Sequence, residues 1–122
     1  MAKKILLIED MKGIRDSLEM ILSMGGYQLD HAANGAEGLR KAAATAYDLV
    51  VTDILMPEVD GTEVIMALRA AGNRVPILAI SGGGAGVSAD AALMVAKEKA
   101  TAILAKPFSK SELLDAVRAL LA

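Results

Sequence analysis

The chain has 122 residues, which is the usual size of one domain and too short for two ordinary ones. Hydrophobic residues make up 54% of it but aromatic residues only 2%, so a core must be built from aliphatic side chains. A formal net charge of -2 supplies no positive field for a nucleic-acid backbone, and the absence of cysteine excludes disulfides and thiolate metal sites.

Five short apolar runs, rich in branched side chains, alternate with longer stretches of helical periodicity. They predict strands at residues 4–8, 28–32, 47–52, 76–80 and 101–105. Apolar stripes at helical spacing predict helices between the strands and after the last one. The stripes are Ile14, Leu18, Ile21 and Leu22; Leu39, Ala42 and Ala43; Val64, Ala67, Leu68 and Ala71; and Leu113, Val117, Leu120 and Leu121.

Three of these helices carry the same start signal, a capping side chain followed three residues later by glutamate. Strands that alternate with helices of this length need crossover connections, which predicts a parallel sheet with helices on both faces. The continuous apolar runs at 5–8 and 49–51 fit strands buried on both sides, whereas residues 27–32 alternate more, as an edge strand does. The capping pairs are Asn34 with Glu37, Asp60 with Glu63, and Ser109 with Glu112.

Four of the apolar strand runs are followed at once by polar side chains. In an open parallel sheet these positions share the carboxyl edge, where such folds bind ligands. Packed carboxylates repel one another unless a cation bridges them, and a hard ion such as Mg²⁺ takes carboxylate, carbonyl and water oxygens. An ammonium and a hydroxyl then suit the oxygens of a phosphoryl group. The residues concerned are Glu9, Asp10, Asp53, Ser81 and Lys106.

Four fragments resemble the signatures of response-regulator receiver domains: LLIED at 6–10, DILMPEVDG at 53–61, ISG at 80–82 and KPF at 106–108. They occur in the order of that family and nearly at its spacing, and the similarity extends over essentially the whole chain. The resemblance implies an α/β, flavodoxin-like, doubly wound fold with a five-stranded parallel sheet in the order 2-1-3-4-5. It also implies a signalling module of a two-component system or phosphorelay, not an enzyme, although the module takes part in its own phosphorylation and dephosphorylation.

By motif position, the resemblance implies that Asp53 accepts a phosphoryl group from the phosphohistidine of a sensor histidine kinase or a histidine phosphotransfer protein. Asp10 and Asp53 would bind Mg²⁺ or Mn²⁺, and Glu9 would act through the water shell of the metal. The backbone carbonyl of Leu55 would complete the protein ligands. The metal and Lys106 would then neutralise the negative oxygens around the attacked phosphorus.

The resemblance further implies that Ser81 and Lys106 hold the phosphoryl oxygens and that the peptide bond before Pro107 is cis. Ile103 departs from the family pattern, because receivers usually carry a switch Tyr or Phe at that position. A branched aliphatic side chain cannot reproduce the motion of an aromatic ring. We therefore expect the signal to pass through Ser81, the glycine-rich loop at 82–86 and the helix after it.

Two other sequence features carry competing interpretations. The fragment GAGVSA at 84–89 matches a loose dinucleotide fingerprint, but it follows the fourth strand, and about twenty residues later stands Lys106 in place of an acidic residue. A phosphatase with Asp53 as its nucleophile would be favoured by an Asp-x-Asp pair, but position 55 is Leu. A pseudo-receiver would be expected to lose the acceptor or the lysine, and both are present.

His31, the sole histidine, is expected to be an ordinary strand or surface residue, and Met20, Met66 and Met94 are expected to fill the core. No apolar run approaches the length of a membrane span, and no signal peptide is evident. We expect a soluble, cytoplasmic protein with one receiver domain over residues 1–122, no output domain, and no membrane or nucleic-acid partner. The downstream protein target is not identifiable from the sequence.

Overall fold

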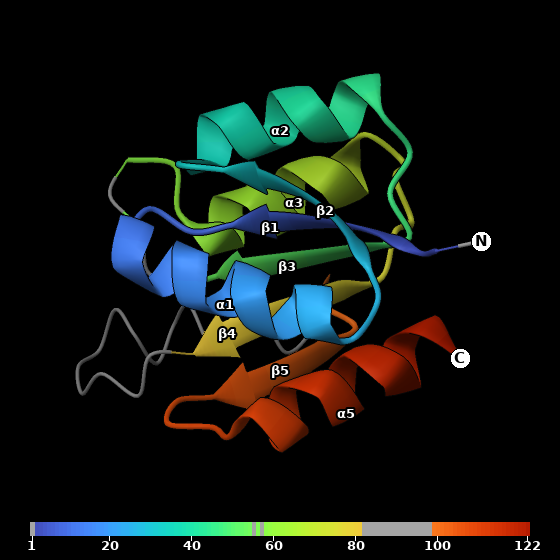
Figure 1. The fold of residues 1–122 in the computed structure, drawn as a ribbon. Coiled ribbons are helices and arrows are strands. Elements are labelled where there is room, and N and C mark those ends of the chain that lie inside the picture. Colours follow the sequence, from blue (N-terminus) through green and yellow to red (C-terminus); the bar gives the residue numbers. More distant parts are fainter. Residues whose placement is uncertain (1, 55, 57, 82–98) are drawn as a thin grey trace.

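The computed structural model describes residues 2–54, 56, 58–81 and 99–122. Its strands form one parallel sheet in the order β2-β1-β3-β4-β5, with helices on both faces (Figure 1). This is the predicted fold. The elements are β1 (Lys4–Ile8), α1 (Lys12–Met24), β2 (Gln28–Ala32), α2 (Gly35–Ala44), β3 (Leu49–Asp53), α3 (Gly61–Ala70), β4 (Ile77–Ser81), β5 (Ala102–Ala105) and α5 (Lys110–Leu121).

Strand β1 shows how the aliphatic core is divided into two layers. Leu6 and Ile8 pack with side chains of α2 and α3, whereas Ile5 and Leu7 pack with side chains of α1 and α5. Figure 1 shows the same division, with α1 and α5 on one side of the sheet and α2 and α3 on the other. Successive strand residues point to opposite faces, so a strand covered on both sides is apolar at every position.

The edge strand and the ends of the strands follow from hydrogen bonding. β2 lies at one edge of the sheet, as predicted. β3 and β4 each run one residue further than expected, because Asp53 still pairs with Ile80, and Ser81 with Ala105. At their other ends, β3 begins at Leu49 and not at residue 47, and β4 begins at Ile77 and not at residue 76. Pro76 has no N–H to donate, although its carbonyl accepts a hydrogen bond from the Val50 amide at 2.9 Å.

All three predicted capping side chains are in place. Asn34 and Asp60 accept hydrogen bonds from the amides of the predicted glutamates. Ser109 forms a complete capping box, in which its hydroxyl accepts from the Glu112 amide and the Glu112 carboxylate accepts from the Ser109 amide. These bonds satisfy N–H groups that the first turn of a helix leaves without a partner.

The expectation for the methionines is wrong. Met20 and Met66 lie inside helices, but they are 64% and 52% exposed, because they stand on the solvent side of the apolar stripes. Met56, in the loop after β3, is buried instead. His31 is an exposed residue of β2, as predicted, with its Nδ1 2.6 Å from Glu19 Oε1.

Several predictions fall outside the described residues: the Leu55 carbonyl, the loop at 82–86, the fragment at 84–89, Met94 and most of the helix expected after that loop. Among the helices that are described, none is long and apolar enough to cross a membrane.

We expect Ser109→Ala to lower the free energy of unfolding by about 1 kcal/mol, because it removes the hydroxyl that accepts from the Glu112 amide at the start of α5. The matched control is Ser17→Ala, since the Ser17 hydroxyl donates only to the Gly13 carbonyl within α1. Urea unfolding should show a loss for Ser109→Ala and little change for Ser17→Ala. Equal losses would contradict the capping role.

Candidate functional site

The strand register brings the predicted polar residues to one edge of the sheet. Ile8 pairs with Thr52, which places Glu9 beside Asp53 at the carboxyl ends of β1 and β3. On the other side, the backbone amide of Lys106 donates to the Ser81 carbonyl at 2.8 Å. Residues from four strand ends therefore meet at this edge.

Asp53 ends the central strand β3 and is 7% exposed. Its Oδ2 lies 3.2 Å from the ammonium of Lys106, which follows β5. The peptide bond between Lys106 and Pro107 is cis, as the resemblance implied. The structure thus holds a carboxylate and an ammonium together in a partly desolvated corner, where charge interactions are stronger than in water.

Glu9 is the most deeply buried acidic side chain that the structure describes, at 1% exposure. Neither of its carboxylate oxygens meets a donor among the described residues. Burial is the main cause that raises the pKa of Glu9 to about 8. The adjacent Asp53 adds to the rise, because it accepts a hydrogen bond from the protonated acid and repels the charged one, whereas Lys106 acts in the opposite direction.

The donor chemistry of this corner fits a small, hard divalent cation. The oxygens of Glu9 lack a donor, Asp53 is next to them, and Asp10 is close enough to raise the pKa of Glu9 by its charge. In the described part of the chain, no three acidic or histidine side chains lie together in a way that could hold a metal ion by themselves. Mg²⁺ ordinarily keeps several water ligands, so it needs only one or two of these carboxylates.

Sequence reasoning missed two residues that shape this corner. Gly61 begins α3 against the backbone of β3, and a Cβ there would lie 2.1 Å from the Asp53 carbonyl oxygen, so no larger residue fits. Arg15, on α1, donates from Nη1 to the Glu9 carbonyl at 2.9 Å and fixes the turn that carries Glu9 and Asp10. The sequence offered a signal for Gly61, because a glycine directly after the Asp60 cap indicates a close approach of the backbone. It offered none for Arg15, because a hydrogen bond from a side chain to a backbone carbonyl leaves no sequence pattern.

Ile103 lies in β5 opposite Ala79, half-buried against the core layer that includes α2 and α3. An aliphatic side chain therefore fills the position where the resemblance implied a switch aromatic ring. Ser81, the last residue of β4, is partly exposed beside Lys106.

Comparison with known proteins agrees with this geometry. The family model for the response regulator receiver domain matches residues 5–118. The transcriptional regulatory protein PrrA of Mycobacterium leprae is 39% identical over 97% of this chain and 49% of its own length. The response regulator MprA of Mycobacterium ulcerans is 37% identical over 99% and 51%. The chain therefore spans about half the length of these relatives.

Solved structures share the fold. The chemotaxis protein CheY4 of Vibrio cholerae has a TM-score of 0.85 and 29% identity, covering 99% of this chain and 100% of that one. The receiver domain of the sensor histidine kinase PA1611 of Pseudomonas aeruginosa PAO1 has a TM-score of 0.88 and 28% identity over 99% and 98%. The latter was solved with a magnesium ion coordinated in its active-site cleft.

The pKa of Glu9 predicts how stability depends on pH in the metal-free protein. In the unfolded chain Glu9 loses its proton near the ordinary value of 4.5, whereas in the folded state it keeps the proton up to about 8. Between these values the folded state binds more protons, so the contribution of Glu9 to stability falls as the pH rises.

Urea unfolding in EDTA from pH 5 to pH 8 should show this fall in the unmodified protein, and Glu9→Gln should lack it. Glu63→Gln, which changes an exposed glutamate of α3, should retain it. The same pH slope in Glu9→Gln as in the unmodified protein would contradict the assignment.

Proposed function

The chain belongs to the receiver-domain family of two-component response regulators, and from that membership we propose that it accepts a phosphoryl group on the carboxylate of Asp53. One observation carries the proposal: Asp53 is buried at the end of the central strand with a lysine ammonium 3.2 Å from its Oδ2. An aspartate without such a partner would repel the anionic group that it must attack.

The proposed transfer moves the phosphoryl group from a histidine nitrogen to a carboxylate oxygen. An oxygen of Asp53 bonds to phosphorus while the phosphorus–nitrogen bond of the donor breaks, and its electron pair leaves with the imidazole. The product is an acyl phosphate on Asp53. The Lys106 ammonium pairs with one phosphoryl oxygen, and the Ser81 hydroxyl, beside it, donates to another.

We expect Asp10, Asp53 and the carbonyl of Leu55 to bind Mg²⁺ or Mn²⁺, with Glu9 acting through a bound water. The assignment is supported by the two buried carboxylate oxygens of Glu9, which meet no hydrogen-bond donor among the described residues. The ion, when bound, supplies positive charge to the oxygens of the transferring group. Arg15 keeps the turn between β1 and α1 in place through the Glu9 carbonyl, so these carboxylates are positioned before the transfer.

A protein donor is supported by an apolar groove of about 470 Å³ beside Lys106. It is lined by Ile14 and Leu18 of α1 and by Lys106, Pro107 and Phe108. Met11, at the start of α1, is 57% exposed. An apolar surface next to the reacting carboxylate suits the helices that carry the phosphohistidine of a sensor histidine kinase or a phosphotransfer protein.

After phosphorylation, we expect Ser81 to move toward the new phosphoryl group and to alter the surface that a downstream protein recognises. Ile103 has no ring to follow that motion, so the path would run through the loop after Ser81. The absence of cysteine supports placing this exchange in the reducing cytoplasm. We also propose that residues 1–122 act as one receiver domain.

The test of this function is phosphorylation by acetyl phosphate, followed by intact mass. We expect the mass of one phosphoryl group to be added in the presence of Mg²⁺, and none in EDTA or in Asp53→Asn. Asp115→Asn, which changes an exposed aspartate of α5, is the matched control and should be labelled like the unmodified protein. Undiminished labelling of Asp53→Asn would rule out Asp53 as the acceptor.

A further inference from the structure

A cavity lined by two arginines lies at the edge of the sheet opposite Asp53, where α3 ends and the chain turns into β4. It measures about 450 Å³, and the described residues that line it are Arg69, Gly72, Asn73 and Arg74. Two of the four are arginines and none is acidic. The sequence explains the imbalance, because no aspartate or glutamate occurs between Glu63 and Asp90. The described lining of this cavity therefore carries an excess of positive charge.

The guanidinium of Arg69 is held in a fixed position by backbone carbonyls. Its Nε donates to Lys99 at 3.1 Å, and its Nη1 donates to Asn73 at 3.0 Å and to Val75 at 2.8 Å. The N–H groups of Nη2 make no hydrogen bond within the part of the chain that the structure describes. Burial lowers the pKa of Arg69, as expected for a cation partly removed from water.

The loop that carries Arg74 is also fixed. The amide of Gly72 donates to Arg69 and that of Asn73 to Leu68, which is the Schellman ending of a helix, and Gly72 adopts the required positive φ of 77°. The Asn73 side-chain oxygen then accepts from the Val75 amide at 3.0 Å. Arg74 thus extends from a loop whose backbone is restrained at both ends.

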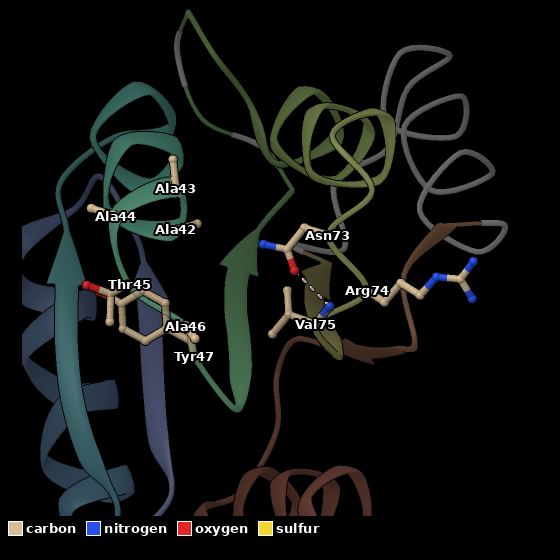
Figure 2. Close-up of a pocket in the computed structure, with 9 residues that line it drawn as sticks. All are labelled: Ala42, Ala43, Ala44, Thr45, Ala46, Tyr47, Asn73, Arg74 and Val75. Atoms are coloured by element: carbon tan, nitrogen blue, oxygen red, sulfur yellow. Dashed lines mark hydrogen bonds between the residues drawn. The ribbon is translucent and has the colours of Figure 1, made fainter.

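Figure 2 shows the neighbouring cavity of about 430 Å³, which shares Asn73 and Arg74 with the first cavity and is also lined by Val75. Its other wall consists of the small side chains of residues 42–46 and the ring of Tyr47. The Arg74 side chain points away from that wall (Figure 2). Among the described residues, Arg74 is the one charged side chain that lines the neighbouring cavity, whereas Arg69 and Arg74 both line the first cavity.

We propose that Arg69 and Arg74 form a binding site for the phosphate group of a small metabolite, at the sheet edge opposite Asp53. Two guanidinium groups match the double charge of a phosphate better than the single charge of a carboxylate, and their forked N–H groups suit its oxygens. The cavity volume is that of a small-molecule site. A bound anion would also compensate the desolvated charge of Arg69. The site is separate from the phosphorylation chemistry at Asp53.

The test is an NMR titration of the full chain with inorganic phosphate in EDTA, at an ionic strength matched with sodium chloride. We expect the Arg69 Nε–H and the Gly72 amide to shift and to saturate, because these groups lie in or beside the site. Arg74→Gln should weaken binding about tenfold, as expected for loss of one charged hydrogen-bond donor. Arg74 is exposed, so this variant should fold.

Arg118→Gln is the matched control, since Arg118 is an exposed arginine of α5 that pairs with Asp115. It should bind phosphate like the unmodified protein, and acetate should bind more weakly than phosphate. Shifts that rise linearly and are reproduced by chloride would overturn the proposal, as would equal affinity in Arg74→Gln. Acetate that binds as tightly as phosphate would overturn the choice of a phosphate group.

Discussion

The electrostatic balance between Glu9, Asp53 and Lys106 is the constraint on which the carboxyl edge of the sheet depends. Two adjacent carboxylates, both almost removed from water, cannot carry their charges together without a cation. In the structure, Lys106 lies against Asp53, and Glu9 meets the constraint by keeping its proton to about pH 8. A divalent cation would release that proton, and the corner would then carry the charges that phosphoryl transfer requires.

The rest of the fold serves to hold this corner in place. β1 and β3 are buried on both faces, so their ends cannot shift without disturbing both core layers. Gly61 lets α3 begin directly against the Asp53 backbone. At the opposite edge of the sheet the sign of the charge is reversed. There Arg69 and Arg74 line a cavity whose described lining contains no acidic side chain. The two edges would thus bind different ligands without competing.

The fold, and the meeting of polar strand ends at one edge of the sheet, could be predicted because both leave local patterns in the sequence. Strand runs, capping pairs and polar strand ends are properties of neighbouring residues. The exposure of Met20 could not be read in this way, because methionine is compatible with either side of a helix. The carbonyl contacts of Arg15 and Arg69, and the raised pKa of Glu9, arise from residues brought together only by folding.

Calorimetric titration of Mg²⁺ at pH 7, in two buffers that differ in ionisation enthalpy, tests the electrostatic account most directly. Because Glu9 has a pKa of about 8 without metal, it should be mostly protonated at pH 7. Binding should therefore release close to one proton from the unmodified protein and none from Glu9→Gln. Heats of binding that do not depend on the buffer, or equal proton release from both proteins, would contradict the account.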